Sequence, residues 1–206
     1  MKVAVLGASG KSGRAFVAAA LAAGHEVTAG VRRQNPFKEQ PNLRVVTCDV
    51  TIKDQLSATV MGQDAVVSLL GHVRGTPANM QTDAMKLLAE VMEQAGVKRL
   101  VSLTGSGARQ PDDIISLIDR VMNASIGLID PKRIQDGVDY IKVLQSSALN
   151  WTVIRVLKLT NQKAGNFTLT EHGPAKTFIS RASVAQAILQ VLSDQSYIKQ
   201  CPVLSS

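Results

Sequence analysis

Three glycines recur at every third position near the start of the chain, at Gly7, Gly10 and Gly13. Glycine carries no Cβ, so backbone N–H groups can approach a bound diphosphate, and a helix starting there turns its positive end toward the phosphates. The spacing alone is a weak signal, because glycines also end strands and cap helices for structural reasons. The residues predicted to hold a diphosphate are Gly7, Ser9, Gly10, Lys11, Ser12 and Gly13.

A strand must precede these glycines and a helix must follow them if they bind a dinucleotide. Residues 3–6 are a short aliphatic run that suits a strand buried on both faces. Residues 14–23 are an alanine-rich segment that ends before Gly24, as a helix would. This order of elements favours a nucleotide site over a purely structural turn, and it is the start of a Rossmann unit.

Two arginines, Arg32 and Arg33, follow a second predicted strand at residues 26–31. In a Rossmann unit an acidic residue near this point binds the 2′-hydroxyl of the adenosine ribose, whereas arginine accommodates a 2′-phosphate. No acid is present here, and two guanidinium groups can form charge-assisted bonds to a phosphate. We therefore expect NADP(H) to be preferred over NAD(H). The alternative is that both arginines are solvated charges at a strand end.

The ends of the next two strands supply further candidates. Asp49 and Val50 follow the third strand and are predicted to contact the adenine, although Asp49 is equally suited to cap a helix that begins near residue 51. Leu70 and Gly71 end the fourth strand and are expected to lie along the nicotinamide, because ligands of such sheets bind at the carboxyl ends of strands.

Polar side chains follow the fourth and fifth strands. His72, Arg74 and Gly75 form a predicted loop near the crevice, in which His72 is either catalytic or an ordinary surface residue. Thr104 and Ser106 lie at the carboxyl end of the fifth strand, where they are candidates for substrate contact or else simple turn residues.

Predicted strands and helices alternate along the chain, which favours a parallel sheet with helices on both faces. Further strands are expected at residues 43–47, 65–70, 100–103, 151–156, 167–169 and 178–180, with an edge strand at 197–204. Further helices are expected at residues 51–61, 77–95 and 183–192, and from Asp130-Pro131 with Ile134, Val138, Ile141 and Ala148 buried. The expected fold is a single α/β domain over residues 1–206, a three-layer, doubly wound Rossmann domain with a mostly parallel sheet.

Composition narrows the class of partner. The chain has 206 residues, of which 45% are hydrophobic and 3% aromatic, with a formal net charge of +7. Such a chain folds as a globule, and the scarcity of aromatic rings counts against binding single-stranded nucleic acid. The positive charge is spread along the sequence, so we expect cofactor phosphates rather than nucleic acid or a membrane as its anionic partner. Cys48 and Cys201 lie far apart without a metal-binding spacing, which predicts reduced thiols, no metal and a cytoplasmic location.

Residues 111–128 are more apolar than a surface helix requires. Three interpretations remain open for this segment. It lines a substrate pocket, it acts as a lid, or it contacts another subunit.

Several motifs together resemble the atypical short-chain dehydrogenase/reductases. They are Gly-Ala-Ser-Gly-Lys-Ser-Gly at residues 7–13, Val-Arg-Arg at 31–33, Cys-Asp-Val at 48–50, Asp-Ala-Val-Val-Ser-Leu-Leu-Gly at 64–71, Trp-Thr-Val-Ile-Arg at 151–155 and Phe-Ile-Ser-Arg at 178–181. Within that group the chain is most similar to the NmrA-like proteins and to the biliverdin-IXβ reductases, which are also NADPH-dependent flavin reductases. The resemblance covers nearly the whole chain and implies an NADP(H)-binding Rossmann domain.

The chain departs from these relatives at the positions that would supply a proton. Most short-chain reductases carry a Tyr-x-x-x-Lys pair, in which the ammonium lowers the pKa of the phenol. Here Tyr140 is followed at that spacing by Leu144, and Tyr197 by Cys201. The flavin-reductase relatives also carry a histidine after the sixth strand, where this chain has Lys158. These departures argue against alcohol–ketone chemistry and against tetrapyrrole reduction.

Reduction of an electron-poor ring requires less of the protein, because such a ring accepts hydride without a placed acid. We therefore expect an NADP(H)-dependent oxidoreductase that reduces a flavin, a quinone or a similar conjugated acceptor, with a flavin as substrate rather than bound cofactor. Thr104, Ser106 and Lys158 are predicted to face the acceptor, within a substrate-side region at residues 105–130 and 157–180. We expect a monomer or a weak homo-oligomer.

Two other functions remain open. The missing Tyr-x-x-x-Lys pair is compatible with a non-enzymatic redox sensor that binds NADP(H) and reports to a partner protein, as the resemblance to NmrA-like proteins implies. An isomerase or epimerase of nucleotide sugars would need the same missing pair and a larger substrate domain, so we place it last.

Overall fold

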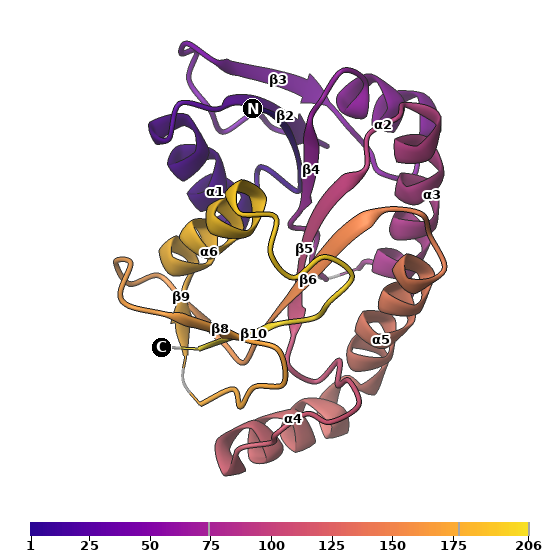
Figure 1. Ribbon diagram of the computed structural model, residues 1–206. Coiled ribbons are helices and arrows are strands. Elements are labelled where there is room, and N and C mark those ends of the chain that lie inside the picture. Colours follow the sequence, from indigo (N-terminus) through magenta and orange to yellow (C-terminus); the bar gives the residue numbers. More distant parts are fainter. Residues whose placement is uncertain (74, 177, 206) are drawn as a thin grey trace.

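The computed structural model describes residues 1–73, 75–176 and 178–205, so Arg74, predicted in the loop near the crevice, lies outside the described residues. The main sheet has eight strands in the order β3-β2-β1-β4-β5-β6-β10-β8 (Figure 1). Neighbouring strands are parallel except for β8, which runs antiparallel to β10. The strands are β1 (Lys2–Leu6), β2 (Glu26–Val31), β3 (Leu43–Thr47), β4 (Ala65–Ser68), β5 (Arg99–Gly105), β6 (Asn150–Val156), β8 (Thr168–Thr170) and β10 (Val203–Ser205).

Helices cover both faces of this sheet (Figure 1). Helices α1 (Lys11–Ala22) and α6 (Arg181–Ser193) pack together on one face, and α2 (Lys53–Val60), α3 (Met80–Gln94) and α5 (Pro131–Gln145) lie on the other. Helix α4 (Leu117–Ile129) extends beyond the sheet and contacts α5, and a small second sheet pairs β7 (Leu159–Thr160) with β9 (Ile179–Ser180). The predicted three-layer Rossmann architecture is confirmed.

The alternation of side chains along the strands creates a core on each face. Val3 and Val5 of β1 pack into the cluster that includes α1 and α6, whereas Ala4 and Leu6 pack into the cluster of α2, α3 and α5. All four side chains are at most 1% exposed. Full burial of a valine or leucine side chain contributes about 1.5–3 kcal/mol, which explains why this short strand needs no polar face.

The order of the strands places a crevice at the centre of the sheet. Strand β1 has β2 on one side and β4 on the other, so the connections that leave β1 and β4 diverge at their carboxyl ends. Open α/β sheets bind ligands at such a switch point. The glycine turn at residues 7–10 and the loop after Ser68 meet there, because the Leu69 N–H donates to the Leu6 carbonyl at 3.0 Å.

The predicted edge strand at residues 197–204 is wrong in extent and in position. Strand β10 is limited to Val203–Ser205 and lies between β6 and β8. Tyr197 and Lys199 have φ angles of +55° and +59°, which an extended strand does not allow, so these residues form a turn. Ala148 was also expected to be buried but is exposed, because α5 ends at Gln145.

The apolar segment at residues 111–128 is only partly helical, since α4 begins at Leu117. The irregular part before it is fixed by a buried ion pair, in which Arg155 of β6 donates to both carboxylate oxygens of Asp113. Leu117 and Leu128 of α4 are 77% and 88% exposed. Met122 and Ile126 of the same helix line the smaller cavity described below, in agreement with the pocket-lining interpretation. The lid and the subunit contact remain predictions.

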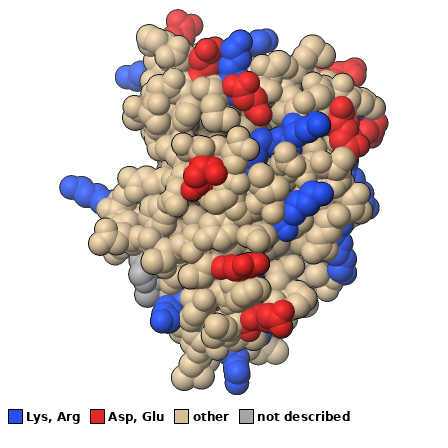
Figure 2. Space-filling model, in the orientation of Figure 1, with Lys and Arg blue, Asp and Glu red and all other residues tan. Residues whose placement is uncertain are grey.

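On the face of the molecule drawn in Figure 2, positive charge is dispersed. Figure 2 shows Lys and Arg side chains separated by Asp, Glu and uncharged residues on the face in view, without a continuous patch. Within residues 1–73, 75–176 and 178–205, no helix is long and apolar enough to cross a bilayer, and no group of three or more His, Cys, Asp or Glu could hold a metal ion.

Candidate active site

The turn between β1 and α1 can be built only with glycine at two positions. Gly7 has a φ angle of +71°, and a Cβ added to it would lie 2.8 Å from the Leu69 carbonyl oxygen. A Cβ added to Gly13 would lie 2.2 Å from the Gly7 carbonyl oxygen, so α1 packs directly on the turn. The Gly10 N–H closes the turn by donating to the same Gly7 oxygen at 3.0 Å. The glycine pattern therefore has a steric cause in this fold.

The amino terminus of α1 is suited to an anion. Gly10 is the N-cap and provides no side-chain hydrogen bond, and the first turn of the helix contains no acidic residue. The first N–H groups of a helix lack partners within the helix and carry partial positive charge. Lys11 and Ser12 stand at this end, so a phosphate group would meet an ammonium, a hydroxyl and free backbone donors.

A cavity of about 850 Å³ extends from this turn across the ends of β2, β3 and β4. Its volume lies within the range of small-molecule and cofactor sites. Its lining includes Gly7, Ser9, Gly10, Lys11 and Ser12 at the turn, Arg32 and Arg33 after β2, Asp49 and Val50 after β3, and Leu70 and Gly71 after β4. The structure thus brings together the predicted cofactor residues except Gly13, which is buried beneath the turn.

Asp49 forms a local turn with Thr51. Its Oδ1 accepts hydrogen bonds from the Thr51 N–H at 3.0 Å and from the Thr51 hydroxyl at 2.8 Å. These bonds lower the pKa of the Asp49 carboxyl, and the positive charge of Arg32 lowers it further. Helix α2 begins only at Lys53, with Ile52 at its N-cap and no capping side chain. The alternative that Asp49 caps this helix is therefore wrong, while its contact with adenine remains a prediction.

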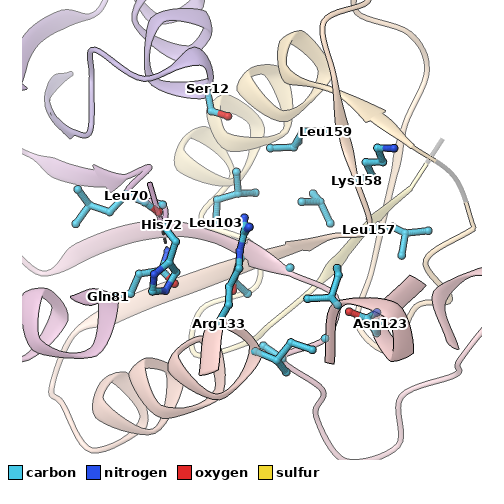
Figure 3. Close-up of a pocket in the computed structure, with 18 of the residues that line it drawn as sticks. Ser12, Leu70, His72, Gln81, Leu103, Asn123, Arg133, Leu157, Lys158 and Leu159 are labelled. Atoms are coloured by element: carbon cyan, nitrogen blue, oxygen red, sulfur yellow. Dashed lines mark hydrogen bonds between the residues drawn. The ribbon is translucent and has the colours of Figure 1, made fainter. Parts of the chain in front are cut away.

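A second cavity, of about 440 Å³, adjoins the first (Figure 3). Both cavities are lined by Ser12 of α1, by residues 69–72 after β4 and by Arg181 of α6. The other walls of the second cavity come from the ends of β5 and β6, from α4 and from α5. Figure 3 shows Ser12 pointing into it from above and Arg133 reaching into it from α5. The two cavities therefore form neighbouring parts of one site.

Thr104 and Lys158, two of the three predicted acceptor residues, line the second cavity. Thr104 is half-buried at the end of β5. Lys158 is exposed beyond the end of β6, and its Nζ lies 5.0 Å from the centre of the Phe178 ring. Such a cation–π contact contributes about 0.5–1 kcal/mol at an exposed site, so the lysine is lightly held at the cavity wall.

Ser106 does not line either cavity. Its hydroxyl is buried and donates to Asp119 Oδ1 at 2.5 Å, and it accepts from Asn123 Nδ2 at 3.0 Å. Asn123 Nδ2 also donates to the same Asp119 oxygen at 2.6 Å. These bonds fasten α4 to the end of β5. The structure thus separates Ser106 from the other two predicted acceptor residues, because the hydroxyl faces a carboxylate on α4.

Sequence reasoning missed several residues of the second cavity. Gln81 in the first turn of α3 donates from Nε2 to the Leu70 carbonyl oxygen at 2.8 Å. Arg133 stands in the first turn of α5, and Arg181 in the first turn of α6 donates to the Thr160 carbonyl at 3.1 Å. All three residues lie in the first turn of a helix that begins near the carboxyl edge of the sheet. A polar residue at such a helix start was the sequence signal that could have identified them.

The ionisable side chains that line the second cavity are all basic. Arg133, Lys158, Arg181 and the titratable His72 line it, and no Asp or Glu is among its described lining residues. Three fixed positive charges around a concave site raise the local potential and attract anions. The cavity is therefore suited to a ligand that carries negative charge.

The phenol of Tyr140 is buried in the core, so it cannot donate a proton at the protein surface. Its side chain is 1% exposed on α5, and burial raises the pKa of its phenol far above the ordinary value. Its hydroxyl accepts from Ser102 at 3.4 Å within the core. Lys142 is instead paired with Asp139 on the surface, at 3.0 Å. The geometry agrees with the absence of a Tyr-x-x-x-Lys pair in the sequence.

Comparison with known proteins adds to this picture. An uncharacterized chloroplastic protein of Arabidopsis thaliana is 29% identical over 99% of this chain and 76% of its own length. A short-chain dehydrogenase/reductase of Veillonella parvula, solved in complex with NADP, is 15% identical and covers all of this chain and 94% of its own, with a TM-score of 0.84. A candidate NADH-flavin reductase of Streptococcus pneumoniae is 24% identical over 100% and 99% of the two chains, with a TM-score of 0.81.

A further structure, of the anaerobilin reductase ChuY from Escherichia coli O157:H7, covers 100% and 97% of the two chains at 18% identity, with a TM-score of 0.80. At these identities the solved structures establish a shared fold. A protein-family model described as NAD(P)H-binding matches residues 7–195. The match begins at the first glycine of the turn and includes the described lining residues of both cavities except Leu6. This chain therefore belongs to the NAD(P)H-binding family and shares the fold of a short-chain dehydrogenase/reductase.

Proposed function

We propose that the protein is an NADP(H)-dependent oxidoreductase that transfers hydride to a flavin, a quinone or a similar conjugated acceptor. One observation carries this proposal. A cavity lined by a diphosphate-type glycine turn adjoins a second cavity, and the two share residues 69–72 at the switch point of the sheet. A cofactor in the first cavity and an acceptor in the second would therefore meet at that shared wall.

The cofactor residues are assigned by their places in the larger cavity. The glycine turn would hold the diphosphate, Arg32 and Arg33 the 2′-phosphate, and Asp49 and Val50 the adenine, with Leu70 and Gly71 beside the nicotinamide. NADPH held by these residues would supply the hydride for the acceptor. The protein's part is to fix the two partners at one distance and orientation and to limit the access of water.

We place the acceptor in the smaller cavity, whose lining overlaps the substrate-side region predicted at residues 105–130 and 157–180. Thr104 and Lys158 would contact the acceptor, and Ser106 would act indirectly by holding α4 in place. The cluster of Arg133, Lys158 and Arg181 favours an acceptor that carries a phosphate or a carboxylate in addition to its conjugated ring. Flavin mononucleotide (FMN) meets both requirements, whereas riboflavin has the ring without the charge.

The alternative of a non-enzymatic NADP(H) sensor requires only the first cavity. A sensor that reports to a partner protein has no use for a second cavity beside the nicotinamide. The cavity of about 440 Å³ next to residues 69–72 thus favours a reductase.

Turnover tests the proposal. Purified protein is mixed with NADPH and, separately, with FMN, riboflavin and a panel of quinones without oxygen, and loss of the reduced nicotinamide absorbance is followed. We expect oxidation with at least one acceptor and a higher kcat/KM for FMN than for riboflavin. Binding of NADPH without oxidation by any acceptor would contradict the reductase and support the sensor.

A further inference from the structure

His72 and Asp136 form a pair at the wall shared by the two cavities. His72 Nε2 lies 2.8 Å from Asp136 Oδ2, and the two side chains are 12% and 1% exposed. The Asp136 oxygens accept all their other hydrogen bonds, so Nε2 is the nitrogen that carries a hydrogen toward the carboxylate. Among the described residues, the other ring nitrogen, Nδ1, has no hydrogen-bond partner.

Asp136 is held rigidly. Its Oδ2 accepts from the Gln81 N–H at 2.9 Å, and its Oδ1 accepts from the Thr82 N–H at 2.9 Å and from the Thr82 hydroxyl at 2.5 Å. These donors belong to the first turn of α3, where the helix dipole stabilises a negative charge. A buried carboxylate that is anchored at a helix amino terminus fixes the direction of the imidazole bonded to it.

The position of His72 distinguishes it from its neighbours. Ser12, residues 69–72 and Arg181 are the described residues that line both cavities. Among them, His72 is the one whose side chain can act as both a proton donor and a proton acceptor, whereas arginine stays charged and serine stays neutral. Figure 3 shows its ring beside Gln81, across the cavity from Lys158.

We infer that His72 is the proton donor to the reduced acceptor and that Asp136 is its positioning residue. This inference rests on the proposed reductase function. An acceptor that has taken up hydride carries one additional negative charge, and one proton cancels that added charge. The N–H bond of the His72 imidazolium breaks, its electron pair stays on the nitrogen, and an O–H or N–H bond forms on the acceptor. Water then returns a proton to the imidazole through the open cavity.

The charged groups near His72 come from several elements. Asp136 of α5 is in direct contact, while Arg133 of α5, Arg181 of α6 and Lys158 after β6 share the smaller cavity with it. Asp83 of α3 and Lys11 of α1 line the larger one. The neighbouring cations attract the reduced acceptor, whose charge in turn draws the proton from the imidazolium.

The test compares His72→Gln with His172→Gln. Glutamine at residue 72 still donates to Asp136 but cannot deliver a proton, and His172 is a matched control because it is exposed beside Glu171 and lines neither cavity. We expect kcat with FMN to fall on the order of 100-fold in His72→Gln, as is typical when a general acid is lost. We also expect kcat of the wild type to fall as pH rises, and this dependence should be absent from His72→Gln. His172→Gln should match the wild type in kcat and in the pH dependence of kcat.

Asp136→Asn tests the positioning role. If Asp136 acts through the imidazole, this change lowers kcat in the wild-type background and has no further effect on kcat in the His72→Gln background, whereas a merely structural effect would be the same in both. Thermal unfolding of each variant measures the structural contribution separately.

A third measurement does not depend on turnover. In ¹⁵N NMR spectra of the NADP⁺ complex, assigned with His72→Gln, the His72 ring should change between its charged form and the neutral form with hydrogen on Nε2 as pH rises. Wild-type activity that His72→Gln retains with an unchanged pH profile would overturn the proton donor and leave the reductase intact. A His72 ring that stays in one protonation state would also overturn it. A wild type inactive with every acceptor would overturn the reductase and, with it, this inference.

Discussion

Gly13 lies so close to Gly7 that a Cβ atom on residue 13 would stand 2.2 Å from the Gly7 carbonyl oxygen. This contact sets α1 directly on the turn that we assign to the cofactor diphosphate. The oxygen belongs to the backbone of the turn, and residue 13 belongs to α1. A side chain at residue 13 can therefore be accommodated only if the turn moves away from the helix.

We therefore predict that Gly13→Ala lowers the free energy of unfolding by about 1–3 kcal/mol, the usual cost of overpacking, and also weakens NADPH binding. Urea unfolding and calorimetric titration measure the two effects. Gly165→Ala is the matched control, because nothing lies within 4 Å of a Cβ at residue 165 and its φ angle is ordinary. Unchanged NADPH affinity in Gly13→Ala would show that this turn does not bind the cofactor.

The arginines after β2 supply a second prediction. Arg32 and Arg33 line the cofactor cavity and are exposed to solvent. Hydrogen bonds to a charged group contribute about 1.5–3 kcal/mol, so Arg32→Ala and Arg33→Ala should each weaken NADPH binding on the order of 10- to 100-fold. The affinity for NADH should change little, since NADH has no 2′-phosphate. Arg44→Ala removes the same charge from an exposed position of β3 outside both cavities, and equal losses for NADPH and NADH would refute the assignment.

The charge of the acceptor supplies a third prediction. Arg133 reaches into the smaller cavity from α5 (Figure 3). Arg133→Gln should raise the KM for FMN several-fold and leave the KM for riboflavin nearly unchanged, because only FMN carries a phosphate. Steady-state kinetics with both flavins measure this difference. Arg120→Gln, on the exposed side of α4 and outside the cavity, should leave both values at those of the wild type.

The Ser106 network supplies a fourth prediction. Ser106→Ala removes a donor from the buried Asp119 carboxylate, and the loss of one partner of such a bond costs about 1–3 kcal/mol. Because α4 forms a wall of the acceptor cavity, we also expect a higher KM for the acceptor and an unchanged dissociation constant for NADPH. Ser125→Ala, an exposed serine on the same helix, is the control. A change in kcat alone would instead indicate that Ser106 takes part in the chemistry.

The pH dependence of stability supplies a fifth prediction. The pKa of the Asp49 carboxyl is lowered in the folded chain by its hydrogen bonds from Thr51 and by Arg32. A lowered pKa means that the stabilisation is fully present above the ordinary carboxyl pKa and is lost as pH falls through the folded value. Asp49→Asn should thus be less stable than the wild type near neutral pH in urea unfolding. A difference that persists under strongly acidic conditions would show that the charge is not its cause.

The fold was predictable because its pattern is local. The aliphatic run at residues 3–6, the glycines after it and the Asp130-Pro131 helix start each specify their own element, and in the structure Asp130 caps α5 by accepting from the Arg133 N–H. That most of the predicted cofactor residues would line one cavity was predictable for the same reason, since they lie at the carboxyl ends of strands of the parallel sheet.

The acceptor side was less predictable because its contacts join residues that are distant in sequence. His72 and Asp136 are 64 positions apart, and nothing near Asp136 in sequence indicates that it reaches the first turn of α3. Ser106 was predicted to face the acceptor, but Asp119 and Asn123 on α4 take up its hydroxyl. The position of β10 inside the sheet likewise depends on β8, which pairs with it from more than 30 residues earlier.

The most direct test of the central claim is calorimetric titration of the wild-type protein with NADPH and, separately, with NADH. The account predicts saturable binding of one NADPH per chain, tighter than that of NADH, because the glycine turn holds the diphosphate of both coenzymes and Arg32 and Arg33 contact only the 2′-phosphate of NADPH. Absence of binding heat with either coenzyme would contradict the account.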